Sequence, residues 1–234
     1  MALDSTNFLK NILGRFCKKT NDSAVKSIYM GYESLIENWK SARPEYKNFC
    51  YDGPLFDELW ANSSKIMFLL KECHEDWYEF RGYEHGPQGN SNLFWRNIRI
   101  WTYIIDEITN NRKPSYNEAL KIKEEPNKSI AYVNLKKNAE KKGNSSDFDI
   151  CEYVKKDKDF LLQQIDFIKP NIVLCCGTFK FCNLLYNKID KISDRLHLGD
   201  NMYFIDFWHP SYQYSSFQNN YEELIKNVEK IKIS

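Results

Sequence analysis

The sequence predicts an α/β fold in which helices cover both faces of a central sheet. Short apolar runs typical of buried strands alternate with longer segments whose apolar residues recur every three or four positions. Such alternation indicates a largely parallel sheet, because parallel neighbours are joined by crossover helices. Polar residues stand at the ends of several strands, which is the edge where such sheets bind ligands. We therefore predict a three-layer α/β/α fold around a mostly parallel, four-stranded sheet.

Length and composition suit one folded domain with a helical extension. The chain has 234 residues, 42% of them hydrophobic and 15% aromatic, which is enough apolar surface for a sizeable core. We expect residues 1–62 to form the extension, packed on the same domain, and residues 63–234 to form the α/β domain. The 33 basic and 32 acidic side chains leave a net charge of +1, so any binding to nucleic acid must come from local patches.

The N-terminus and the cysteines indicate a cytoplasmic protein. The N-terminus has neither the apolar core of a signal peptide nor a membrane-spanning segment, so we expect no membrane partner. The seven cysteines form no Cys-x-x-Cys pair, and their odd number argues against a complete disulfide framework. We expect a monomer with free thiols in a reducing compartment.

Helical patterns dominate the extension. Two helices are expected, over Asn7–Lys18 and Asp22–Ser41, because apolar residues recur there at helical spacing. The segment Asp52-Gly53-Pro54 is typical of a turn, and a short helix near Leu55–Trp60 follows it.

Strands and helices alternate through the rest of the chain. The expected strands are short apolar runs at Lys65–Leu70, Ser129–Asn134, Asn171–Gly177 and Met202–Phe207. The expected helices lie at Leu93–Thr109, Tyr116–Lys123, Cys151–Ile168, Phe179–Ile189 and Tyr221–Ile231. The second strand is therefore expected to end on Asn134, and a basic connection over Lys136–Asn144 to follow it.

Four strand-end segments, taken in this order, resemble the uracil-DNA glycosylase superfamily over roughly Lys65 to Ser216. The segment from Gln163 to Gly177 is similar to the family's unit of helix, lysine-proline, strand and glycine. His209-Pro210-Ser211 matches its fourth motif, in which the histidine hydrogen-bonds the O2 carbonyl of a flipped base and stabilises the charge on the departing base. Taken alone, the tripeptide is better explained by a strand-end histidine bonded to backbone before a proline turn.

The resemblance implies further residues of a base pocket. Ala131-Tyr-Val-Asn134 is similar to the family's middle motif, which makes Asn134 the reader of the base edge, although an asparagine that caps a turn is the plain alternative. In the first motif Cys73 stands where many members place an Asp or Asn. Glu72 is therefore the first candidate to activate water, followed by Glu75, Asp76 or His74. Ser211 completes the expected pocket.

The stacking and DNA-contacting residues are also expected from the resemblance. Phe94 is the candidate that stacks on the base, with alternatives at Trp95, Tyr83 and Tyr78, or a role in a core stripe for all of them. Lysines after the second strand form a local patch for phosphates, namely Lys136, Lys137, Lys141 and Lys142. Tyr212 and Tyr214 occupy the loop from which the classical enzymes insert a wedge into the base stack.

The function implied is that of a monofunctional DNA glycosylase. It would flip a uracil-like, damaged or modified base from single- or double-stranded DNA and hydrolyse the N-glycosidic bond with water, without cofactor or metal. Glu75 stands where the classical enzymes have the tyrosine that blocks a 5-methyl group. The substrate base can therefore be larger than uracil. Two alternatives remain: a catalytically inactive module that binds nucleic acid or protein, and another nucleotide-handling enzyme such as a nucleoside hydrolase or deoxyribosyltransferase.

Overall fold

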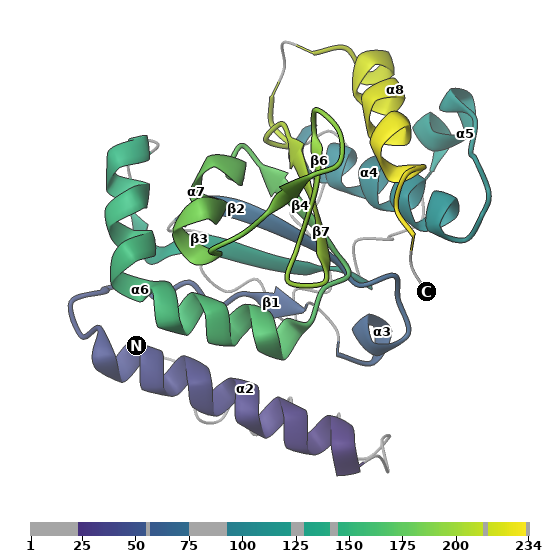
Figure 1. The fold of residues 1–234 in the computed structure, drawn as a ribbon. Coiled ribbons are helices and arrows are strands. Elements are labelled where there is room, and N and C mark those ends of the chain that lie inside the picture. The colour runs from purple at the N-terminus through teal and green to yellow at the C-terminus, as the bar shows by residue number, and fades with distance from the viewer. Residues whose placement is uncertain are drawn as a thin grey trace.

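The centre of the protein is a seven-stranded mixed sheet with the strand order β1-β3-β2-β4-β7-β6-β5 (Figure 1). The computed structural model describes residues 23–54, 57–74, 93–122, 129–140, 145–212 and 215–232. The strands are β1 (Gly53–Pro54), β2 (Ile66–His74), β3 (Ala131–Glu140), β4 (Ile172–Cys176), β5 (Asp190–Lys191), β6 (Leu196–Gly199) and β7 (Met202–Phe207). The four central strands β3, β2, β4 and β7 are parallel, and β1, β6 and β5 pair antiparallel at the two edges. The predicted α/β class is confirmed, but the sheet has seven strands rather than four.

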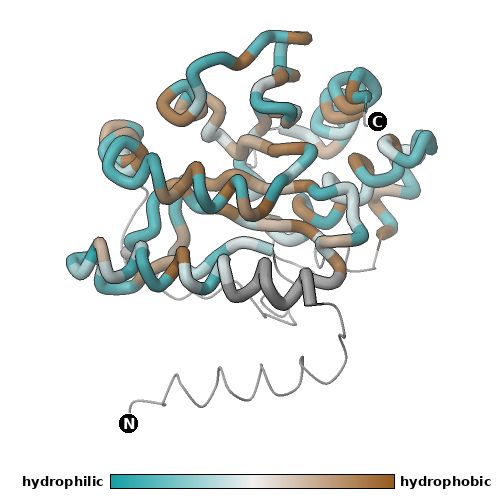
Figure 2. The backbone as a smooth tube through the Cα atoms, turned by 60° about the horizontal axis from the view of Figure 1, so that its bottom comes forward, coloured by the Kyte–Doolittle hydropathy of each residue, from teal (hydrophilic) through white to brown (hydrophobic). Residues whose placement is uncertain are grey.

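Helices lie on both faces of the sheet (Figure 1). They are α2 (Ser23–Ala42), α3 (Asp57–Ala61), α4 (Leu93–Thr109), α5 (Tyr116–Lys121), α6 (Asp147–Ile168), α7 (Phe179–Leu185) and α8 (Phe217–Val228). Apolar and polar residues alternate along them, as expected for helices with one buried side (Figure 2). The predicted helix over Asn7–Lys18 lies outside the described residues. No helix among the described residues has both the length and the apolar character needed to cross a bilayer.

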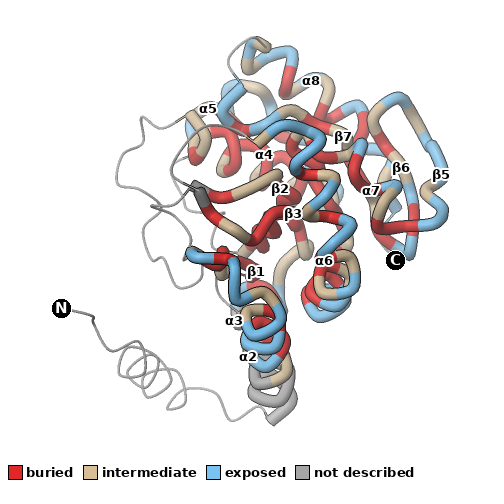
Figure 3. Tube along the Cα trace, turned by 90° about the vertical axis from the view of Figure 1, so that its left-hand side faces the viewer, coloured by how far each residue is buried: buried red, intermediate tan, exposed pale blue. Residues whose placement is uncertain are grey.

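Two hydrophobic cores fill the spaces between the sheet and its helices. Alternate residues of β2 enter opposite cores: Phe68 and Leu70 face α4 and α8, whereas Met67 and Leu69 face α6 and α7. This is the period of two that a strand imposes on its side chains. Buried residues therefore concentrate in the central strands, while the outer sides of the helices are exposed (Figure 3).

The segment before the first parallel strand shares this core. Helix α2 packs against α6, with the rings of Trp39 and Phe160 stacked at a centroid distance of 5.2 Å. Strand β1 pairs with β3, and the Tyr32 hydroxyl donates to the Asp52 carbonyl at 2.6 Å. Residues expected to form a helical extension packed on the domain thus also supply the edge strand β1 of the sheet.

Two element boundaries differ from the prediction for identifiable physical reasons. Strand β3 runs to Glu140 instead of ending at Asn134, because its lysines find buried carboxylate partners and can enter the sheet. Helix α6 begins at Asp147 rather than Cys151. Its N-terminus is a capping box, in which the Ser146 side chain accepts from the Asp149 N–H and the Asp149 carboxylate accepts from the Ser146 N–H.

Candidate active site

The candidate site is the carboxyl edge of the sheet between β2 and β4, where the strand connections diverge, and we refer to this position as the crevice. From β2 the chain crosses to β3 on one side, and from β3 it returns past β2 to β4 on the other side. Helix α4 covers one face and α6 the other, so the connections diverge between β2 and β4. This reversal of strand order is where open α/β sheets bind their ligands. Gly177, which follows β4, has a φ of 70° and open space where a Cβ would lie, so this side of the crevice is not filled by the glycine's neighbours.

His209 stands above the end of β7 in a turn that is fixed by hydrogen bonds. The Ser211 N–H donates to Nδ1 of His209 at 3.2 Å, and the Tyr212 N–H donates to the His209 carbonyl at 2.8 Å. From helix α4, the Asn97 side chain donates to the Pro210 carbonyl at 2.6 Å. Because Nδ1 acts as an acceptor, the neutral imidazole carries its proton on Nε2. The turn therefore presents a fixed N–H donor.

The surroundings of His209 favour this neutral form. His209 as a residue is exposed, and one side of its ring lies against Phe94 with centroids 5.7 Å apart. Desolvation lowers the pKa of His209, and the charge of Lys71 lowers this pKa further. At pH values between the ordinary and the lowered pKa of His209, the unfolded chain binds more protons at this residue than the folded chain does. The contribution of His209 to the free energy of unfolding is therefore lost as the pH falls through this range.

The Lys71→Met variant is expected to raise the pKa of His209. Loss of the positive charge removes one of the two causes of the shift, while burial keeps the pKa below its ordinary value. An NMR titration of the imidazole Cε1 proton measures the change. Lys180→Met is the matched control, because it breaks an ion pair of the same network without removing a charge that acts on His209. Equal His209 pKa values in wild type and Lys71→Met would contradict the assignment.

Phe94 and Trp95 begin helix α4 and have different surroundings. Phe94 is partly buried, and its ring contacts both His209 and Trp95. Trp95 is buried in the core against Tyr132, with ring centroids 5.8 Å apart. The structure thus brings the predicted stacking residue beside the predicted histidine, although they are far apart in sequence. Tyr78 and Tyr83 lie outside the described residues.

Asn134 lies within β3, opposite Leu70 of β2, and not at the end of the strand. Its side chain is fully buried. The amide nitrogen Nδ2 donates to Asp52 at 3.1 Å and to the Cys50 sulfur at 3.4 Å, and the Asn134 backbone N–H donates to the same Asp52 oxygen at 2.7 Å. The carboxamide oxygen Oδ1 has no hydrogen-bond partner among the described residues. Asp52 therefore fixes the carboxamide with its acceptor turned away from the carboxylate.

Asp52 is the centre of a buried polar cluster that sequence reasoning missed. Its second oxygen accepts from Lys137 Nζ at 2.6 Å and from Gln164 Nε2 at 2.8 Å. Asp52, Asn134, Lys137 and Gln164 all have 0% exposure. In the sequence Asp52 has the appearance of an ordinary turn residue in Asp-Gly-Pro, and no local pattern links it to a lysine 85 residues away.

Lys136 and Lys137 do not form the predicted surface patch for phosphates. Lys136 is 2% exposed and binds Glu72 at 3.2 Å, whereas Lys137 is fully buried against Asp52. The structure places both ammonium groups in buried pairs with carboxylates, a position that does not present them to a phosphate. Lys141 and Lys142 lie outside the described residues.

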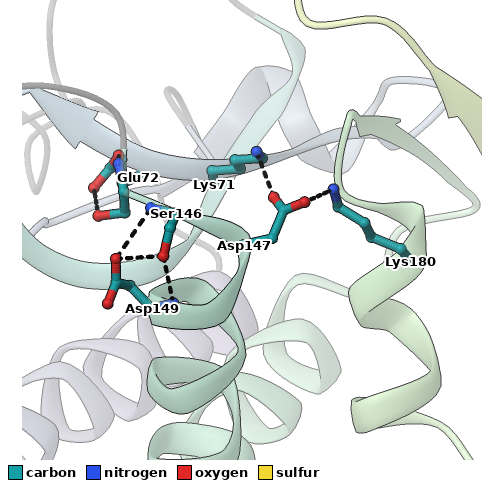
Figure 4. Close-up of polar contacts among 7 residues, drawn as sticks. Lys71, Glu72, Ser146, Asp147, Asp149 and Lys180 are labelled. Carbon is teal, nitrogen blue, oxygen red and sulfur yellow. Dashed lines mark hydrogen bonds and ion pairs between the residues drawn. The ribbon is translucent and has the colours of Figure 1, made fainter.

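Glu72, the predicted water-activating residue, uses both carboxylate oxygens within the protein. One accepts from the Ser145 N–H at 2.5 Å, and the other accepts from the Ser145 hydroxyl at 2.6 Å and from Lys136. These contacts join the end of β2 to the residues that precede α6 (Figure 4). Of the alternatives, Glu75 and Asp76 lie outside the described residues, as does the side chain of His74.

The other residues expected in the pocket lie at different depths. Cys73 is 4% exposed in the core on the α4 side, in the same core as Cys50, whose thiol pKa is raised chiefly by burial and also by Cys73. Ser211 is exposed in the His209 turn, and Tyr212, at 40% exposure, follows it. Tyr214 lies outside the described residues.

A second charged network lines the α6 side of the crevice. Lys71 at the end of β2 binds Asp147 at 2.8 Å, and Lys180 of α7 binds the other oxygen of the same carboxylate (Figure 4). The hydrogen bond from Lys180, followed by that from Lys71, lowers the pKa of Asp147. The network connects β2, α6 and α7, and it holds the Lys71 charge that acts on His209.

Among the described residues, no three His, Cys, Asp or Glu side chains are grouped so that they could hold a metal ion. The chain matches no protein-family model and no curated protein. An assignment of function to this crevice therefore depends on the chemistry of its side chains.

Proposed function

We propose that the protein is a DNA glycosylase that binds a flipped uracil-like or modified base in the crevice and hydrolyses its N-glycosidic bond. The observation that carries the proposal is the turn at His209, which holds a neutral imidazole with its Nε2–H available beside the Phe94 ring. When the bond to the sugar breaks, negative charge collects on the base. A fixed donor at the carbonyl oxygen next to the broken bond stabilises this charge better than mobile water does.

Asn134 supplies the complementary group for a base of this kind. A buried acceptor without a donor costs about 1–3 kcal/mol, and a ligand N–H that binds to it recovers this cost. The ring N–H of uracil is such a donor, whereas cytosine has an unprotonated acceptor at the same position. The Oδ1 atom of Asn134 therefore supports a preference for a base with a carbonyl next to a ring N–H.

The position of Asn134 in the sheet also suits a base that inserts deeply. The strand register puts Asn134 level with Leu70 and Cys176, one residue below Gly177. Strands β3 and β7 are three spacings apart, about 14 Å at roughly 4.8 Å each, and we place the base above β2 and β4, between Asn134 and the His209 turn. The parallel strands and two helical layers are consistent with the three-layer uracil-DNA glycosylase-like arrangement, which we include in the proposal.

Glu72 favours a second candidate function, a module that binds nucleic acid without hydrolysis. Hydrolysis requires a group that orients or deprotonates water, and the Glu72 oxygens are occupied by Ser145 and Lys136. A module of this kind would keep the crevice and the aromatic contact of Phe94 but lack turnover.

An excision assay separates the two functions. Labelled single- and double-stranded oligonucleotides that carry uracil, hypoxanthine, xanthine or a 5-substituted pyrimidine are incubated with the protein, and alkali then cleaves any abasic site. We expect cleavage by the wild type, and a loss of turnover in Asn134→Ala that exceeds its loss of DNA affinity, because the carboxamide acts on the base edge. Binding of every oligonucleotide without cleavage of any would leave the binding module as the function.

A further inference from the structure

We propose that Arg96 binds a phosphodiester of the DNA strand next to the nucleotide whose base enters the crevice. This inference rests on the proposed function for the class of ligand. Its starting point is that the lysines expected to contact phosphate, Lys136 and Lys137, are buried and paired. Another cation near the His209 turn is therefore needed.

Three other cations near this edge of the sheet have carboxylate partners. Lys71 and Lys180 share Asp147, and Arg195 lies 3.7 Å from Glu223. Arg96, in contrast, has no carboxylate partner among the residues that the structure describes. Its contact there is with an aromatic ring, since its guanidinium carbon lies 4.2 Å from the centroid of Phe217.

Stacking of this kind leaves the guanidinium able to bind an anion. The guanidinium carbon lies over the Phe217 ring, and the five N–H donors of the group spread outward in its own plane. Arg96 is only partly exposed, so the contact with Phe217 restricts the side chain before a ligand arrives. An arginine that is pre-oriented in this way matches the bidentate geometry of a phosphate.

The position of Arg96 connects it to the candidate active site. Its neighbours in α4 hold the His209 turn: Phe94 contacts the His209 ring, and Asn97 donates to the Pro210 carbonyl. Phe217 is the first residue of α8, which follows the same turn. No acidic residue lies in the first turn of either α4 or α8, so an anion at this point meets no carboxylate from these turns.

The test measures the binding of a fluorescently labelled single-stranded DNA oligonucleotide by anisotropy across a range of salt concentrations. We expect Arg96→Met to weaken binding about tenfold, as loss of one charge-assisted contact does. The slope of log affinity against log salt should fall by about 0.7, the value for one phosphate of a single strand. Arg96→Lys should keep most of this slope because it keeps the charge, and inorganic phosphate should compete more weakly with Arg96→Met than with the wild type.

Lys155→Met is the control, because Lys155 lies on α6, is exposed and is paired with Glu152. It should leave the slope unchanged, and the thermal midpoints should show that all variants fold. Equal slopes for Arg96→Met and the wild type, or no DNA binding by the wild type, would overturn the inference. If Arg96→Met lowers the salt slope but the wild type excises no base, the phosphate contact of Arg96 stands and the glycosylase activity is refuted. Base excision by the wild type, together with a salt slope that Arg96→Met leaves unchanged, would support the glycosylase and refute the role of Arg96.

Discussion

Replacement of His209 by alanine is expected to lower the rate of base excision about 10²- to 10³-fold, the loss typical of removing one preorganised donor to a developing anion. The effect should be on turnover, because the Nε2–H interacts most strongly with the departing base in the transition state. The turn itself should survive, since Asn97 binds the Pro210 carbonyl independently of the imidazole. Single-turnover excision kinetics and DNA binding, measured on the same oligonucleotide, separate the two effects.

His197→Ala is the matched control for this experiment. His197 lies on β6, its ring stacks on Phe179 at a centroid distance of 4.1 Å, and burial lowers its pKa as it does for His209. It differs in position, because it lies outside the His209 turn. A loss of excision in His197→Ala equal to that in His209→Ala would mean that a general loss of structure, and not the donor, explains both.

Lys137→Met is expected to destabilise the fold by about 3–5 kcal/mol, because removal of one partner of a buried ion pair leaves an uncompensated charge. Methionine keeps most of the apolar stem, so the loss comes from Asp52, which remains buried with Asn134 and Gln164 as its donors. A loss of this size is a large part of the stability of a typical domain. Urea unfolding followed by circular dichroism measures it.

A double variant and a surface control test the physical reason. Asp52→Asn combined with Lys137→Met removes both charges but keeps a side-chain oxygen that can accept from Asn134, and it should be less destabilised than Lys137→Met alone. Lys155→Met, which breaks an exposed pair with Glu152, should leave the midpoint unchanged. A near-neutral Lys137→Met variant would show that the Asp52 cluster contributes little to the fold.

The buried cluster links stability to the site. Asp52 precedes the edge strand β1, and it accepts from both the backbone and the side chain of Asn134. The segment before the first parallel strand therefore does more than cover the sheet, because it fixes which atom of Asn134 remains available. Truncation of this segment should accordingly disturb both folding and base selection.

The parallel strands and the long amphipathic helices were predictable because their signals are local. β4 is an unbroken apolar run, β7 is apolar except for Asp206, and α4 has apolar residues at helical spacing. The start of α6 also had a local signal that the prediction did not use, since Ser146 and Asp149 have the spacing of a capping box. The small edge strands β5 and β6 are too short for a reliable pattern.

The second half of β3 could not be predicted, because its stability depends on distant partners. Lys136, Lys137 and Asn138 have the composition of an exposed loop, and they enter a sheet only because Glu72 and Asp52 neutralise the two ammonium groups. Because β3 continues through these lysines, Asn134 lies within the strand and not at its end. The sequence named His209 and Phe94 and the structure brings their rings together, whereas Asn97, Asp52 and Arg96 were found only from three-dimensional contacts.

Mass-spectrometric detection of the free base tests the central claim most directly. The protein is incubated with oligonucleotides that contain uracil or one of the other modified bases, and the released small molecule is identified and counted against the abasic sites formed. We predict one free base per abasic site with the wild type, and release by His209→Ala that is slower by two to three orders of magnitude, roughly the effect of one lost donor. Absence of a free base with every substrate, or equal release by both proteins, would contradict the account.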